Sequence, residues 1–152
     1  MNKIRFKTLV IFLLICIVII WYIFTQHRFT KEIDKEIAAA VYINDEVVEQ
    51  TTITIKGKKH KTYLSDKEFY DGLFAIGYYK ITYRDGVTAR ITWNNAPGIE
   101  TQRLSYYHVG DFTSFDLTGL IIIDEEMNEI ALGFKDGTII ATSDALYLKY
   151  KK

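Results

Sequence analysis

Cysteine, proline and histidine are all scarce in this chain of 152 residues, which contains one Cys, one Pro and three His. The single cysteine, Cys16, excludes an intrachain disulfide and a zinc site built from several cysteines. The single proline and the lack of any low-complexity tract argue against a disordered stalk. Stability therefore has to come from the packing of side chains.

An excess of either charge is also missing, since 19 Lys and Arg face 19 Asp and Glu. All the acidic residues follow the apolar segment near the N-terminus, whereas Lys3, Arg5 and Lys7 precede it. The part of the chain beyond this segment is therefore weakly acidic. Nucleic-acid binding requires a strongly basic surface, so this charge balance argues against it.

What the chain does have is an uncharged run over residues 8–26, TLVIFLLICIVIIWYIFTQ. As a helix these nineteen residues span about 28 Å, close to the roughly 30 Å hydrocarbon core of a bilayer. We predict a transmembrane helix over 8–26, with Trp21 and Tyr22 at the membrane interface. The run is longer than the ~7–15 apolar residues of a signal peptide, which favours an uncleaved anchor.

The basic residues around this run predict its orientation. Lys3, Arg5 and Lys7 lie in the short tail of residues 1–7, and the positive-inside rule places such a tail in the cytoplasm. Arg28, Lys31 and Lys35 make the count even over a wider window. Because the closest charges precede the run, we expect a single-pass protein of the cell membrane with its C-terminal domain outside.

Residues 27–45 allow two interpretations. Phe29, Ile33, Ile37 and Val41 recur every four residues, which predicts a helical neck that continues the membrane helix. The competing interpretation is a strand, in which Ile37, Ala39, Val41 and Ile43 alternate with the residues between them. Three consecutive alanines at 38–40 favour the helix.

Residues 46–152 show the two-residue period of β-strands. Thr51, Ile53 and Ile55 alternate with polar residues, Gly57 is expected to turn the chain, and Asp136-Gly137 predicts a tight hairpin. The Asn94–Gly98 stretch is expected to be a loop. The pattern predicts a mainly β fold of about eight short antiparallel strands in meander order, as a sandwich, roll or barrel, and we adopt the sandwich or roll as the fold class.

Aromatic residues provide the candidate binding surface. In the pairs Tyr78-Tyr79 and Tyr106-Tyr107, adjacent rings on a strand point to opposite faces, so one ring of each pair is expected outside. Exposed Tyr and Trp are good anchors for proteins or sugars, and Trp93 belongs with them. The alternative is that tyrosine simply suits strands.

Catalytic and metal-ligating motifs are not found. The three histidines, His27, His60 and His108, do not form a ligand pattern, and no G-x-S-x-G motif occurs. The acidic stretch 124–129 does not match the calcium-loop pattern. We therefore predict that it forms a solvated hairpin tip. The basic stretch 56–61 either contacts anionic lipid or wall polymer, or protects an edge strand. No catalytic residue, metal ligand or cofactor is assigned.

Three segments carry a resemblance to known proteins: TTITIKGKKHKTYL, FYDGLFAIGYY and GLIIIDEEMNEIALGFKDGTIIATSDA. Together with the N-terminal run they are similar to small, uncharacterised, membrane-anchored β-rich proteins of Gram-positive bacteria. That resemblance implies an architecture and no activity. We expect a non-enzymatic module that binds an envelope protein or a wall polymer. An envelope hydrolase and an accessory subunit of a membrane complex are the alternatives.

Overall fold

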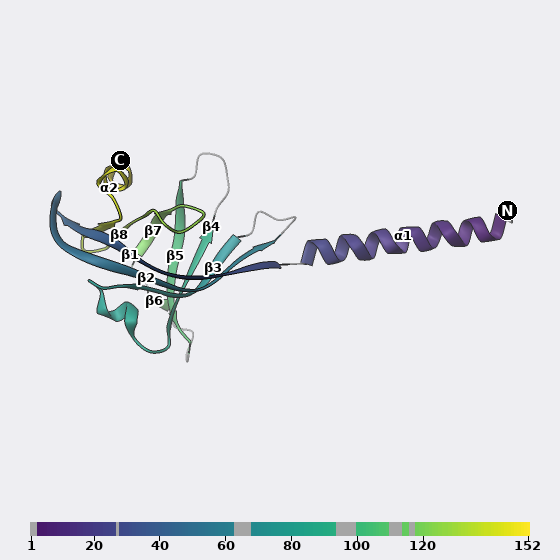
Figure 1. The fold of residues 1–152 in the computed structure, drawn as a ribbon, viewed down its shortest axis with the longest axis horizontal. Helices are drawn as coiled ribbons and strands as arrows, with labels where there is room; N and C mark the ends of the chain where they lie inside the picture. Colours follow the sequence, from purple (N-terminus) through teal and green to yellow (C-terminus); the bar gives the residue numbers. More distant parts are fainter. Residues whose placement is uncertain (1–2, 27, 63–67, 94–99, 110–113, 116–117) are drawn as a thin grey trace.

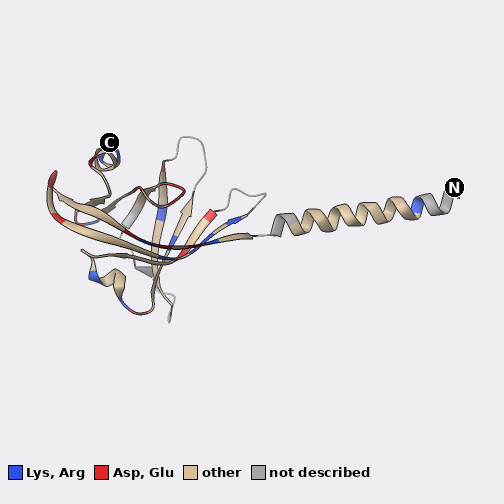
Figure 2. Ribbon diagram, in the orientation of Figure 1, with Lys and Arg blue, Asp and Glu red and all other residues tan. Residues whose placement is uncertain are grey.

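The computed structural model describes residues 3–26, 28–62, 68–93, 100–109, 114–115 and 118–152. The N-terminal helix α1 covers Lys3–Gln26 and projects away from the β domain (Figure 1). From residue 8 to residue 23 its described side chains are exposed or partly exposed, and its charge is confined to the N-terminal end (Figure 2). Over the described residues, no helix is both long enough and apolar enough to cross a membrane.

The β domain is a closed antiparallel barrel. Its strands are β1 (Arg28–Ile43), β2 (Glu46–Thr62), β3 (Glu68–Ile76), β4 (Val87–Trp93), β5 (Thr101–His108), β6 (Ser114–Phe115), β7 (Thr118–Ile123), β8 (Ile130–Phe134) and β9 (Ile139–Ala141). The order β4-β3-β2-β1-β9-β8-β7-β5 closes on itself through the β4–β5 pairing, and β6 extends the sheet beside β5. A short 3-10 helix, η1 (Lys80–Tyr83), links β3 to β4.

The mainly β, antiparallel, meandering character of the prediction is confirmed, and the sandwich or roll is corrected to a barrel. The Asp136-Gly137 hairpin between β8 and β9 is also confirmed, with Gly137 at φ 85° as a tight turn requires. The predicted loop at Asn94–Gly98 lies outside the described residues.

The predicted helical neck over 27–45 is wrong, because β1 occupies this stretch. Ile33, Ala39 and Val41 are buried in the core while Glu32 and Asp34 are exposed, the alternation of a strand. A spacing of four residues fits both a helical turn and two strand periods, so it could not decide between them. Every residue of β1 pairs with β2 in the antiparallel register, which outweighs the helix propensity of the alanines.

The predicted turn at Gly57 is also wrong, because β2 runs straight through it. Gly57 lies opposite Gly72 of β3, and a Cβ built on Gly57 would be 2.8 Å from the Gly72 Cα. The Tyr70 hydroxyl would lie 2.7 Å from the same Cβ. Glycine at 57 therefore serves the close approach of two strands around a buried tyrosine.

Side chains fill the barrel interior. The largest of the fully buried ones are Tyr70, Tyr106, Phe74, Ile53, Ile55, Ile76, Ile91, Leu104, Ile121, Met127, Ile130 and Leu132. An eight-stranded barrel has an interior just wide enough to be filled in this way. A second cluster lies outside the barrel wall, where the C-terminal helix α2 (Asp144–Lys151) packs Tyr147 on Tyr42 at a ring distance of 4.0 Å.

Candidate functional site

The barrel separates the aromatic residues that the sequence grouped as a binding surface. Tyr106 points into the barrel, where it is 1% exposed and donates a hydrogen bond to the Phe74 carbonyl at 2.9 Å. Tyr107 lies on the outer face and donates to Asp71 Oδ1 at 3.2 Å. The expectation that one ring of this pair faces outward is confirmed.

On the outer wall, Tyr107 belongs to a small polar cluster. Arg90 donates two hydrogen bonds to the Asp71 carboxylate, from Nε to Oδ1 at 2.7 Å and from Nη2 to Oδ2 at 2.8 Å. The Asp71 carboxylate raises the pKa of Arg90, and burial together with Asp71 raises the pKa of Tyr107. This cluster pairs its own charges internally, as expected of a structural feature of the wall.

Tyr78 and Tyr79 follow β3 at the end of the barrel away from α1, outside the strand in which the sequence placed them. Tyr79 stacks on Phe134 at 3.9 Å and donates to Asp136 Oδ2 at 2.7 Å. The two tyrosine rings meet edge to face at 5.1 Å, and both pack against the core while remaining partly exposed.

Trp93 ends β4 at the opposite end of the barrel and is 5% exposed. The five candidate residues therefore form no continuous surface. Trp21 and Tyr22, the candidate membrane-interface residues, are 66% and 65% exposed on α1.

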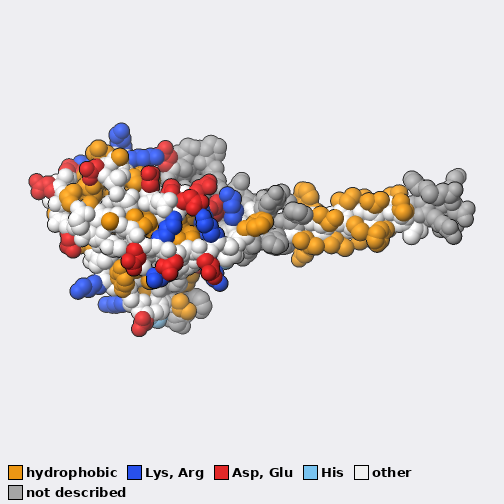
Figure 3. All heavy atoms as spheres, in the orientation of Figure 1, with side chains coloured by type: hydrophobic (Ala, Val, Ile, Leu, Met, Phe, Trp, Pro, Cys, Tyr) orange, Lys and Arg blue, Asp and Glu red, His pale blue; other side chains and the backbone are white. Residues whose placement is uncertain are grey.

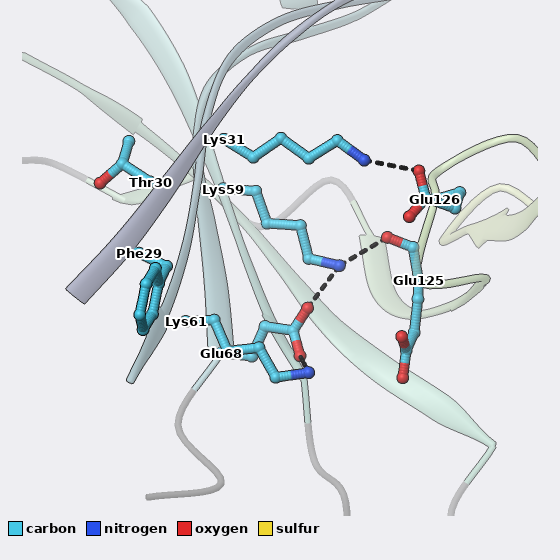
Figure 4. Close-up of a pocket in the computed structure, with 8 residues that line it drawn as sticks. All are labelled: Phe29, Thr30, Lys31, Lys59, Lys61, Glu68, Glu125 and Glu126. Carbon is cyan, nitrogen blue, oxygen red and sulfur yellow. Dashed lines mark hydrogen bonds and ion pairs between the residues drawn. The ribbon is translucent and has the colours of Figure 1, made fainter. Parts of the chain in front are cut away.

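A hollow opens at the barrel end nearest α1, which we call the mouth hollow (Figure 4). Its volume is about 240 Å³. The lining residues are Phe29, Thr30, Lys31, Lys59, Lys61, Glu68, Glu125 and Glu126. They come from the start of β1, the end of β2, the start of β3 and the β7–β8 connection, which meet because alternate strand ends of an antiparallel barrel share one rim.

The base of the mouth hollow is a buried ion pair between Lys59 and Glu68. The Lys59 side chain is 10% exposed and that of Glu68 is 3% exposed. Lys59 also donates a hydrogen bond to the Glu125 carbonyl, and the half-exposed Lys61 lies 3.5 Å from the second Glu68 oxygen. Glu68 thus has a cation at each oxygen, as a buried carboxylate requires.

The acidic segment, residues 124–129, forms the other side of the mouth hollow. Lys31 donates to Glu126 Oε2 at 2.6 Å, and Lys35 donates to the Glu126 carbonyl at 2.7 Å and to Asn128 Oδ1 at 2.6 Å. The hydrogen bond from Lys31 lowers the pKa of Glu126. Met127 is fully buried in the barrel core at φ 56°. The segment connects the antiparallel strands β7 and β8, and its residues Glu125, Glu126, Asn128 and Glu129 are exposed, so the predicted solvated hairpin tip is confirmed apart from the buried Met127.

Of the two interpretations of the basic stretch 56–61, edge protection is wrong, because β2 lies between β1 and β3. Lys59 points inward and is buried, whereas Lys56 and Lys58 point outward and pair with Asp34 and Glu32 on β1. The alternation of the strand divides these lysines between the two faces.

Trp93 lies next to the buried Lys59–Glu68 ion pair at the base of the mouth hollow. Lys59 Nζ sits over the Trp93 ring, 4.5 Å from its centroid. Trp93 Nε1 is buried and, among the described residues, has no hydrogen-bond partner. Nearly all buried donors in proteins are paired with protein or water, so this indole N–H is a donor for which the described residues supply no acceptor.

The sequence analysis missed the mouth hollow because its polar residues are far apart in the chain. The available signal was the interruption of a strand's inward pattern by a charge. Lys59 continues the inward series of Ile53 and Ile55, and Glu68 precedes the inward series of Tyr70 and Phe74. Among the described residues, no three His, Cys, Asp or Glu side chains are placed to hold a metal ion.

Comparison with known proteins does not assign the chain to a family. No protein-family model matches the chain, and neither a curated protein nor a solved structure shows significant similarity to it. The resemblance described from the sequence stays a prediction.

Proposed function

We propose that this chain is a single-pass membrane protein that holds a small β-barrel at the cell envelope as a binding module. The supporting observation is the nature of α1, which stands apart from the barrel with large apolar side chains exposed along its length (Figures 1 and 3). Phe12, Val18 and Trp21 are 65–66% exposed. In water such a surface is costly, at about 25 cal/mol per Å² of apolar area.

The proposal uses the full uncharged run of residues 8–26 in the sequence as the membrane segment, with residues 1–7 in the cytoplasm. The barrel is then outside, and only residue 27 separates α1 from β1. A binding role is favoured over catalysis because the barrel interior is packed with apolar side chains. The open polar feature is the mouth hollow.

Membrane retention and topology test this proposal together. We expect full-length protein to remain in membranes after washing with high salt and carbonate. A reporter active only outside the cytoplasm, fused after Lys152, is expected to be active. The double substitution Leu14→Arg and Val18→Arg should release the protein, because each charge at a helix centre costs about 2.5–3.5 kcal/mol of insertion energy.

The matched control is Leu14→Ala and Val18→Ala, which keeps the run uncharged and should leave the protein in the membrane. Release of the unmodified chain by carbonate would contradict anchoring. An active cytoplasmic reporter with a silent external one would reverse the orientation.

A further inference from the structure

The mouth hollow has the charge pattern of a site for a dipolar ligand. Its basic side consists of Lys31, Lys59 and Lys61 from β1 and β2. Across from them lie Glu125 and Glu126 of the acidic segment (Figure 4). Lys31 is paired with Glu126 and Lys59 with Glu68, so the opposite charges that remain for a ligand are those of Lys61 and Glu125. A ligand that carries both signs of charge suits this arrangement better than a simple anion or a simple cation.

Two of these charged side chains, Lys61 and Glu125, have weak ion pairing or none with the described residues. Lys61 Nζ has its ion-pair contact with Glu68 at 3.5 Å, and its side chain is 58% exposed. The Glu125 backbone carbonyl accepts from Lys59, whereas its carboxylate forms no ion pair with any described residue. In Figure 4 the Glu125 side chain runs along the side of the hollow away from Lys61. An ammonium and an oxyanion on one ligand would complement both.

Trp93 provides a reporter group next to the hollow. Its ring lies against Lys59, which lines the hollow, with Lys59 Nζ 4.5 Å from the ring centroid. Trp93 is not itself among the lining residues. The indole therefore reports a change in charge around Lys59 without contacting the ligand.

Size and position restrict the ligand further. The hollow, at about 240 Å³, is below the roughly 300–1,000 Å³ of pockets for drug-sized molecules, and the filled interior leaves no space for an acyl chain. Phe29, Thr30 and Lys31 line it only three to five residues beyond Gln26, the end of α1. At about 3.3 Å per residue, this is close to the head groups of a bilayer that holds α1. Phe29 is 53% exposed at the rim.

We infer that the mouth hollow binds a zwitterionic head group that carries a primary ammonium and a phosphate, with Glu125 accepting from the ammonium and Lys61 pairing with the phosphate. The source is an aminophospholipid of the bilayer next to the barrel, and this inference rests on the proposed membrane anchoring. The same chemistry occurs in free phosphoethanolamine, so the experiment separates the two sources.

Trp93 supplies the readout. The chain has two tryptophans, so Trp21→Phe leaves Trp93 as the only one in the full-length protein. Its emission is measured first in detergent with phosphoethanolamine, then in vesicles of phosphatidylcholine with and without phosphatidylethanolamine. We expect a saturable change with the ethanolamine compounds, because a phosphate paired with Lys61 alters the charge around Lys59, whose Nζ lies over the Trp93 ring.

Two variants in this background test the roles of the side chains. Glu125→Gln and Lys61→Gln should each weaken binding about tenfold or more, since a hydrogen bond to a charged group contributes about 1.5–3 kcal/mol. Glu32→Gln is the matched control, because Glu32 lies on the outer face of β1 and pairs there with Lys58. Its affinity should equal that of the parent, and circular dichroism checks the fold of each variant.

A response to phosphatidylethanolamine vesicles alone supports the lipid source, and an equal response to soluble phosphoethanolamine supports the free zwitterion. No saturable response to either, an equal response to phosphocholine, or unchanged affinity in Glu125→Gln overturns the inference. Retention in washed membranes is measured on the same samples. A retained protein that does not respond refutes the ligand and leaves the anchor standing, whereas a released protein refutes the anchor.

Discussion

The two edges of β1 are sealed in different ways. On one side, all sixteen residues of β1 have a partner in β2. On the other side only Ala40, Val41 and Tyr42 pair with β9. Over residues 28–39 no described strand pairs with that second edge, and the acidic segment covers it with side-chain contacts from Lys31 and Lys35.

This difference shows that side-chain contacts can join neighbouring parts of a barrel wall where backbone hydrogen bonds between strands are missing. An open strand edge has unpaired N–H and C=O groups that invite other chains. The acidic segment is attached to this edge through the side chains of Lys31 and Lys35, and its Met127 is buried in the core. Local opening is cheapest where few backbone hydrogen bonds have to break, so we expect the barrel to open first beside the acidic segment.

The largest expected effect concerns Glu68, which forms the buried ion pair with Lys59 of β2, while Lys59 also donates to the Glu125 carbonyl of the acidic segment. Glu68→Gln leaves a buried ammonium without an anion and should lower the free energy of unfolding by about 4 kcal/mol. Urea denaturation of the detergent-solubilised protein measures this. Replacing both partners, with Lys59→Met and Glu68→Leu, should restore most of the stability. Glu32→Gln removes an exposed partner of Lys58 and should cost less than about 1 kcal/mol.

A smaller loss is expected where β2, the fully paired neighbour of β1, approaches β3. Gly57→Ala places a methyl group against the Gly72 Cα and the Tyr70 hydroxyl, and neither the backbone nor the buried ring can move away freely. We expect a loss of about 3 kcal/mol of unfolding free energy, at the upper end of overpacking. Gly137→Ala is the control, because it strains a positive φ of 85° with nothing within 4 Å and should cost about 1 kcal/mol. Equal losses would mean that the strands at Gly57 separate easily.

At the side-chain-sealed edge, Met127→Ala should cost about 2 kcal/mol, the low end for a buried Met. The cost of a cavity depends on how well its surroundings collapse, and a segment held by side chains can move inward. Leu104→Ala in β5, between two paired strands, is the matched control and should cost more. If Met127→Ala were the more costly of the two, the acidic segment would be as rigid as the paired strands.

The sequence predicted those parts of the fold that depend on local patterns. Thr51, Ile53 and Ile55 alternate with polar residues, and Asp136-Gly137 has the chemistry of a tight turn, so this part of β2 and the β8–β9 hairpin were expected. Closure into a barrel was not chosen over a sandwich or roll, because the ring needs β1 to pair with the distant β9, as Ala40 does with Ala141. No local pattern in the sequence encodes that pairing.

The candidate site was harder still to predict. In the sequence, Lys59 cannot be distinguished from the neighbouring surface lysines. Only the register of β2 in the barrel shows that its side chain lies on the inner face. Trp93 was selected for exposure, yet the feature that makes it informative is a buried N–H without a described partner. Burial of a charged side chain depends on its three-dimensional partners, here Glu68 and the acidic segment, which sequence spacing does not give.

The smallest expected effect is a local loss of stability in the acidic segment at low pH. The hydrogen bond from Lys31 lowers the pKa of Glu126 below its ordinary value of 4.5. A carboxylate with a lowered folded pKa stabilises the fold fully above its unfolded pKa, and this contribution is lost as the pH falls through the folded pKa. Acidification below about 4.5 should therefore loosen the acidic segment first. The measurement is hydrogen exchange at the Met127 amide, which donates to the Asp124 carbonyl at 3.1 Å.

Glu126→Gln should make this amide exchange faster already at neutral pH and remove most of its change with acid. Asp45→Asn is the matched control, since Asp45 pairs with Lys151 at the other end of the barrel and also has a lowered pKa. It should leave Met127 exchange unchanged. Equal acid sensitivity at the Met127 amide and at the amides of β2 would mean that the barrel opens as one unit, and that its two edges do not differ in stability.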